Sequence, residues 1–250
     1  MMQPKLPHER LDVYRLYLET AGQCGDIISN AENQIVALDH IDRAMESIGV
    51  NLIRANSQSS GSPARANYLD VSIGSTYECA AALDVCLVRC ELDNCMHNST
   101  IQKLWRIRGM LLGLKRAASS RVMEENNTYG TALFPFSRLD MYRTSLDGVQ
   151  WLNDFLKQST LRTRTRRKLD TSTTGTVLNI AEGHGRETVD DQNRFMRTAQ
   201  EHAYQTLLIF DLIAARNICT ESQIDEGKVI QRKVIAMLHA WCKRNKKRNG

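Results

Sequence analysis

The chain of 250 residues is 42% hydrophobic and 24% charged, with a formal net charge of +5, which is ordinary for a globular protein of one large or two small domains. No run of about 18 apolar residues could span a bilayer, and the first residues, MMQPKLPHERLD, lack the apolar segment of a signal peptide, so we expect a soluble cytoplasmic protein with no membrane partner. Seven cysteines at irregular spacing argue against a disulfide framework, and we expect reduced thiols.

Helix-favouring residues recur in long stretches without the alternating β-branched pattern of strands, so the chain is predicted to be helical. The expected helices span residues 11–30, 34–55, 63–94, 100–120, 138–158, 162–182, 189–217 and 221–246. Four polar residues stand where N-caps are expected, two of them with a glutamine three residues later as in a capping box: Ser62, Ser99, Thr188 and Thr220. Each predicts that a helix begins directly after it.

The same pattern occurs twice along the chain. The segment RLDVYR at 10–15 returns as RLDMYR at 138–143, an offset of 128. Further on, YLDVSIGSTYE at 68–78 aligns with FMRTAQEHAYQ at 195–205 at an offset of 127. Matching blocks in one order indicate a tandem duplication. We therefore predict an all-α fold of two tandem antiparallel up-down four-helix bundles, with copy one at 1–121, a linker at 122–136 and copy two at 137–250.

The two copies differ in charge. Residues 1–125 carry 13 Lys and Arg against 15 Asp and Glu, whereas residues 126–250 carry 20 against 13. The second half is therefore the candidate for binding a polyanion.

Each copy also carries parts of a recognisable motif. Copy one supplies Leu11, Val13, Tyr14, Arg43, Ala44, Ser47, Asn51, Tyr68, Leu69, Gly74, Ser75 and Glu78. Copy two supplies Leu139, Tyr142, Asn179, Ile180, Ala181, Glu182, Gly183, Gly185, Arg186, Arg194, Phe195 and Ala199. In this combination the chain resembles a family of small bacterial four-helix bundle proteins. That family includes proteins encoded in intervening sequences of ribosomal RNA genes and the accessory variability determinant of diversity-generating retroelements.

The two copies keep different parts of this motif. Copy one has Arg-Ala-x-x-Ser and Gly-Ser-x-x-Glu but reads NLIRANSQSSG where the family has Asn-Ile-Ala-Glu-Gly. Copy two keeps Asn-Ile-Ala-Glu-Gly-x-Gly-Arg but reads EHAYQ in place of Gly-Ser-x-x-Glu. This complementary loss predicts that the halves fill different places in one assembly. The retroelement member resembles a ring-forming basic bundle that binds a reverse transcriptase and its template RNA, so the resemblance implies these partners and a homo-oligomer here.

The motif residues are expected to have structural roles: Arg43, Ser47, Asn51, Gly74, Ser75, Glu78, Asn179, Glu182, Gly183 and Arg186. Gly74 and Ser75 inside a helix indicate a close approach of another helix, within the bundle or between subunits, because glycine there costs about 1 kcal/mol relative to alanine. Asn51 and Asn179 are expected to cap carbonyls at helix ends or to bond to a neighbouring helix. Gly183 is expected to supply a left-handed helix stop.

Two basic clusters are the candidate nucleic-acid contacts. LRTRTRRKLD contains Arg162, Arg164, Arg166, Arg167 and Lys168, and CKRNKKRNG contains Lys243, Arg244, Lys246, Lys247 and Arg248. Positive charge at a helix start opposes the macrodipole, so helix stability does not explain the first cluster. It is either a solvated face or a phosphate site, and the second is either a solubilising tail or a further phosphate site. Two clusters in one copy favour phosphate binding without sequence reading.

No catalytic, cofactor or metal site is predicted. Cys79, Cys86 and Cys90 fall on an apolar helix stripe, as expected of core cysteines, and the metal-binding spacings are missing. Glu182 and His184 have no third orienting group, so we expect neither an enzyme nor a small-molecule substrate. The favoured hypothesis is a non-catalytic protein that binds structured RNA as a reverse transcriptase accessory. The alternative is a scaffold whose basic patches bind only acidic protein surfaces.

Overall fold

The computed structural model describes residues 6–117 and 134–248, without the side chains of 246–248. The described residues form eight α-helices and no strand. The first four helices are α1 (Asp12–Asn30), α2 (Val36–Asn56), α3 (Pro63–Val88) and α4 (Asn94–Ala117). The last four are α5 (Asp140–Gln158), α6 (Thr163–His184), α7 (Val189–Ala215) and α8 (Glu221–Arg248). Short 3-10 turns, η1 (Pro7–Arg10) and η2 (Pro135–Arg138), precede α1 and α5.

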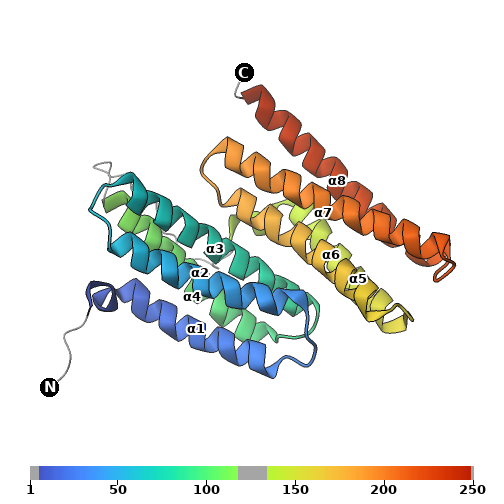
Figure 1. Cartoon of the computed structure of the whole chain (residues 1–250), viewed down its shortest axis with the longest axis horizontal. Helices are drawn as coiled ribbons and strands as arrows, with labels where there is room; N and C mark the ends of the chain where they lie inside the picture. The colour runs from blue at the N-terminus through green and yellow to red at the C-terminus, as the bar shows by residue number, and fades with distance from the viewer. Residues whose placement is uncertain (1–5, 118–133, 249–250) are drawn as a thin grey trace.

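Each set of four helices forms an antiparallel up-down bundle (Figure 1). In copy one, each helix packs on the next along the chain, and α1 closes the bundle against α4. Copy two repeats this arrangement, with α5 packed on both α6 and α8. Amphipathic helices joined by short loops bury their apolar stripes in this way. The predicted fold class is confirmed.

The helix bounds repeat along with the sequence. α5 begins and ends 128 residues after α1, and α7 ends 127 residues after α3. Two residues beyond α3 and α7, Cys90 and Asn217 both have positive φ, 61° and 53°. The two copies can therefore be compared position by position, at an offset of 128 up to α6 and 127 from α7 onward. That each copy folds by itself stays a prediction.

Three of the four predicted N-caps are confirmed by a hydroxyl that accepts from the backbone amide three residues on: Ser62 from Arg65 at 3.2 Å, Thr188 from Asp191 at 3.1 Å and Thr220 from Gln223 at 3.3 Å. The prediction at Ser99 is wrong. α4 begins at Asn94, because Asp93 Oδ1 already accepts from the amide of Met96 at 2.8 Å. Ser99 lies inside α4, where its hydroxyl accepts from Gln23 at 3.2 Å.

α3 ends six residues before the predicted position 94, at Val88. The amide of Glu91 donates to the carbonyl of Cys86 at 2.9 Å, and Cys90 between them takes the left-handed conformation. This is the hydrogen-bond pattern of a Schellman stop, which the apolar spacing does not reveal. Cys90 is consequently exposed, and its prediction as a core cysteine is wrong, whereas Cys79 and Cys86 are buried.

α3 is the central helix of the molecule. It packs on α2 and α4 of copy one and also on α5 and α6 of copy two. By length and composition it could cross a membrane, yet 72% of its most apolar window is buried inside the structure. Helices packed around it account for its apolar composition.

The end of the predicted linker belongs to the contact between the copies. Residues 122–133 lie outside the described part, but Phe134 and Phe136 are almost fully buried. Their rings pack against Tyr77 of α3, Trp105 of α4 and Tyr142 of α5. These aromatic rings continue one apolar core from copy one into copy two.

Candidate nucleic-acid interface

The basic cluster at the start of α6 is divided by the fold. Leu161 is buried and anchors the chain before α6 begins. Arg166 turns back from the first turn of α6, and its Nε donates to the carbonyl of Leu161 at 3.0 Å. Its guanidinium also donates to the carbonyl of Ser159. Arg166 therefore holds the α5–α6 loop, a structural role that the sequence did not indicate.

Three other cations of the cluster gather on one side of α6. Arg162, Arg164 and Lys168 are exposed and line a pocket of about 390 Å³ together with Arg216 from the end of α7. The floor of this pocket is apolar and comes from Ile209, Leu212 and Ile213. Among the described residues, no carboxylate lines it. The pocket suits an anion, either a phosphate or a carboxylate at the edge of an apolar contact.

Arg167 faces the other way, into a cleft of about 630 Å³ between the copies. Asp170, one turn further along α6, forms an ion pair at 3.3 Å with Arg89, the residue directly after α3, and both side chains are about nine-tenths buried. Asp170 also accepts from the amide of Val36 at 3.0 Å, at the first residue of α2. This carboxylate joins two helices of copy one to copy two, because it accepts from both.

The second cluster lies on an ordered helix. α8 continues to Arg248, and Asn245 near its end is buried against Asn193 of α7. Lys243 and Arg244 are exposed, and the Arg244 guanidinium lies 5.4 Å from the centre of the Trp241 ring. Lys246, Lys247 and Arg248 belong to the last turn of α8, with side chains outside the described part.

The two clusters lie at opposite ends of copy two, because α8 begins beside the start of α6 and runs away from it (Figure 1). From Glu221 to Lys243 the helical rise gives a separation of about 33 Å. One compact ligand cannot contact both, whereas a structured RNA or two separate partners can.

Sequence reasoning missed two further cations of α8. Arg232 and Lys233 are exposed in the middle of this helix. A signal was present, because the chain contains no Asp or Glu after Glu226. The basic character of the C-terminal end therefore extends along most of α8.

The motif residues meet where the copies join. The Arg186 guanidinium lies over Gly74 of α3, 2.8 Å from where a Cβ would stand. In the same way, the Tyr77 ring lies 2.8 Å from the Cβ position of Gly185. Gly185 itself has φ −77°, so the close ring, not the backbone conformation, requires glycine there. The part of the motif kept by copy one thus contacts the part kept by copy two.

Charged motif residues surround this contact. Glu182 forms an ion pair with Arg186, and burial raises the pKa of the Glu182 carboxyl, with nearby Glu78 adding to the rise. Glu78 in turn accepts from His40 at 2.8 Å, and Arg43 lies beside that imidazole.

The remaining motif residues bond within copy one or copy two. The side chains of Asn51 and Asn179 each donate to the carbonyl four residues earlier, both at 2.8 Å. They lie inside α2 and α6, so the prediction that they cap helix ends is wrong. Ser75 donates to Ser47 at 2.8 Å and links α3 to α2.

Gly183 is not a left-handed stop, because α6 continues to His184 and ends with Gly185 in right-handed geometry. A Cβ on Gly183 would stand 2.8 Å from Cβ of Phe195. This glycine serves the close packing of α6 on α7.

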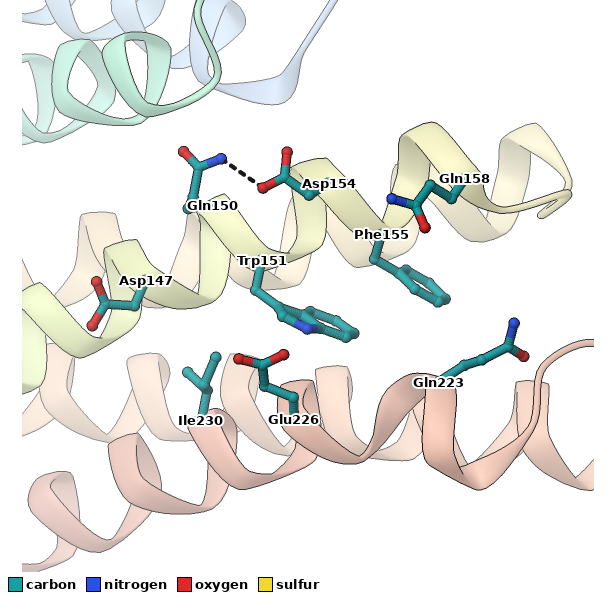
Figure 2. Close-up of a pocket in the computed structure, with 9 residues that line it drawn as sticks. All are labelled: Asp147, Gln150, Trp151, Asp154, Phe155, Gln158, Gln223, Glu226 and Ile230. Atoms are coloured by element: carbon teal, nitrogen blue, oxygen red, sulfur yellow. Dashed lines mark hydrogen bonds between the residues drawn. The ribbon is translucent and has the colours of Figure 1, made fainter.

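A pocket of about 530 Å³ lies between α5 and α8 (Figure 2). The stacked rings of Trp151 and Phe155 form its wall, 5.1 Å apart. Asp147, Asp154 and Glu226 line it without a cation from the described residues. Its negative charge would repel phosphate, so it is no part of the candidate interface.

The described residues contain no group of three His, Cys, Asp or Glu side chains placed to hold a metal ion. Burial raises the pKa of Cys86 to about 12, and a side-chain contact with Cys24 together with burial raises the pKa of Cys79. These thiols stay protonated, and they pack in the core as small apolar groups.

Comparisons of the chain with protein-family models, curated proteins and solved structures found no match. The family resemblance stays a prediction that rests on the motifs.

Proposed function

We propose that this chain is a non-catalytic protein that binds structured RNA through the basic face of α8. One observation carries the proposal: after Glu226 the chain contains eight Lys and Arg residues but no Asp or Glu. The cations are Lys228, Arg232, Lys233, Lys243, Arg244, Lys246, Lys247 and Arg248. Among the cations whose side chains the structure describes, only Lys228 forms ion pairs, with Asp211 at 2.7 Å and with Glu221 at 2.8 Å.

A row of cations along a helix binds phosphates without reading sequence, since affinity comes largely from the release of counterions. The helix offers little for base stacking, because Trp241 lies beneath Arg244. Structured RNA suits this surface better than an unpaired strand, since a folded RNA presents phosphates in rows.

The family resemblance supports a more specific role as an accessory to the reverse transcriptase of a diversity-generating retroelement. In that role the protein would bring RNA and polymerase together. Copurification of the tagged chain with a reverse transcriptase that a neighbouring gene encodes would support this role. A failure to bind that enzyme, with or without RNA, would contradict it.

A filter-binding titration with an RNA hairpin tests the RNA proposal. Lys233→Glu with Lys243→Glu should weaken binding by about tenfold or more and lower the salt dependence by about one unit of slope for each phosphate that the protein no longer neutralises. Lys157→Glu with Arg143→Glu on α5 is the matched control, because it makes the same charge change on exposed side chains that are not part of α8. Equal weakening by both pairs would contradict a role of α8.

A protein-only scaffold is the second candidate, and the pocket of Arg162, Arg164, Lys168 and Arg216 favours it. Its apolar floor is typical of an interface with a protein carboxylate at the edge. Purification at low salt separates the candidates. Nucleic acid that copurifies, seen as a raised ratio of absorbance, supports RNA binding, and its absence supports the scaffold.

A further inference from the structure

The contact between the copies joins two different faces. α3 of copy one packs on α5 and α6 of copy two, whereas α7, the counterpart of α3, contacts no helix of copy one in the described part of the chain. A twofold contact would also bring α7 onto α2, because these are the counterparts of α3 and α6. The contact is therefore heterologous, and each copy has one face that is not used within the chain.

The unused face of copy two is an apolar row on α7. Its residues are the counterparts, 127 positions on, of three buried α3 residues, of which Tyr77 packs against Gly185 of copy two. The α3 residues Tyr77, Ala81 and Val85 are 4%, 0% and 0% exposed, and their counterparts Tyr204, Leu208 and Leu212 are 47%, 57% and 40% exposed. Apolar side chains exposed in a row mark a surface that a partner covers.

The unused face of copy one lies on α1 and on the part of α2 beyond its first turn, because that first turn contacts α6 of copy two. Leu178 and Ala181 of α6 are 3% and 0% exposed, and they lie about two turns and one turn before Gly185, which packs against Tyr77 of α3. Their counterparts, 128 positions earlier, are Val50 and Ile53, which are 37% and 36% exposed. Leu18 of α1 is a further exposed apolar residue of copy one, at 51%.

The buried ion pair of the internal contact has an exposed counterpart on these faces. Arg89 and Asp170 pair between the copies, and the residues at the equivalent positions are Arg216 and Asp42. Both counterparts are exposed. No hydrogen bond or ion pair in the described part of the chain involves either side chain.

A second polar pair is repeated in the same way. The hydroxyl of Tyr142 donates to Asp84 Oδ2 at 2.7 Å across the internal contact. The equivalent residues are Tyr14 and Asp211. In each copy a residue of the fourth helix pairs with this aspartate. His97 lies 2.6 Å from Asp84 Oδ1 in copy one, and Lys228 lies 2.7 Å from Asp211 Oδ1 in copy two.

The charges of the two unused faces are complementary. On α2 the exposed residues Asp42 and Glu46 lie four positions apart and so share one side of the helix. Arg216 of α7 lies among the cations of α6 that line the pocket with the apolar floor. By equivalence to Asp170, Asp42 of another chain would reach Arg216 and the start of α6.

From these repeated positions we infer that α7 of one chain docks on the α1–α2 face of a second copy of the chain. The contact reproduces the internal one, with Leu208 and Leu212 against Val50 and Ile53 and with Arg216 paired to Asp42. It goes beyond the proposed RNA binding and does not require it. Because each chain presents both faces, the contact builds a ring or an open row of chains.

Sedimentation velocity of nuclease-treated protein at micromolar concentration tests the contact. The unaltered chain should associate, and Leu208→Asp should weaken association by at least about tenfold, because it places a charge in the apolar row. Val229→Asp on α8 is the matched control and should leave association unchanged. Val229 is also an exposed apolar residue, and its counterpart Gln102 lies on α4, which packs on no helix of copy two among the residues that the structure describes.

Charge exchange between two variants identifies the partner face. Arg216→Asp alone and Asp42→Arg alone should each remain monomeric, because like charges then face each other. An equimolar mixture should associate again, since Asp at 216 of one variant meets Arg at 42 of the other and the second junction keeps the native pair.

Three results would each overturn the inference. They are an unaltered chain that stays monomeric, equal weakening of association by Leu208→Asp and Val229→Asp, and a mixture of the two charge variants that stays monomeric. RNA binding by the chain that carries Lys233→Glu with Lys243→Glu is measured separately, so failure of the RNA proposal would leave these outcomes unaffected.

Discussion

α3 and α7 are the same helix in two copies, yet one lies at the centre of the molecule and the other at its surface. On α3, Ala81 and Val85 are small and fully buried, whereas α7 has exposed leucines at both positions. The glycine contacts also differ, because Gly74 corresponds to Glu201 and Gly185 to Ser57. The residues of the two polar pairs, by contrast, are present at the equivalent positions of both copies. Close packing therefore marks the permanent contact, while the paired charges are shared by the permanent contact and the inferred one.

The largest expected difference between the two helices is at their arginines. Arg89→Met should lower the free energy of unfolding by about 3 kcal/mol or more, because it leaves Asp170 buried without its cation. Arg216→Met should change the stability of the monomer by no more than about 0.5 kcal/mol, since Arg216 is exposed. Urea unfolding of both variants at low protein concentration measures the difference. Equal effects would contradict the distinction between the two helices.

A smaller difference is expected at the glycines. Gly185→Ala should destabilise the protein by about 1–3 kcal/mol, because the added methyl group would overlap the Tyr77 ring and the backbone there already suits alanine. Ser57→Ala, at the equivalent exposed position of copy one, should have an effect within about 0.5 kcal/mol. Thermal unfolding of the pair checks this. A harmless Gly185→Ala would show that the ring is not held tightly.

The smallest effect concerns pH. Burial raises the pKa of Glu182 in the folded chain above its ordinary value of 4.5. The folded state then binds this proton more tightly than the unfolded state, so the contribution is most favourable below pH 4.5 and is lost as pH rises through the folded pKa. Glu182→Gln should remove this slope, so its stability relative to the unaltered chain should rise with pH above 4.5. A pH-independent difference in urea midpoint would contradict it.

The sequence predicted the helices and their repetition well, because these depend on local periodicity and on caps such as Ser62 and Thr188. The early end of α3 was not predictable in the same way. The residue at this stop is Cys90, not the glycine that usually marks a left-handed helix end. Its conformation follows from the hydrogen bond between Glu91 and Cys86. Local stops made by ordinary residues are hard to see in a single sequence.

The candidate site was predicted only in part. The cluster at the start of α6 was visible as a run of charges, but a run does not show that Arg166 folds back onto a loop or that Arg167 faces the other copy. The complementary loss of motif residues predicts different places for the two copies in one assembly, and this stays a prediction. Which faces meet depends on the packing of α3 on α6, and no local pattern contains that information.

Cross-linking tests directly whether the internal contact is repeated between chains. Unlabelled and isotopically heavy chains that carry Arg216→Lys are mixed and treated with a carbodiimide, which joins amines to carboxylates in contact. The lysine introduced by Arg216→Lys should join Asp42 in pairs of mixed mass. The internal pair of Lys115 and Glu187, 2.7 Å apart, should join only within one chain. Absence of the Asp42 product, while the Lys115–Glu187 product forms, would contradict the account.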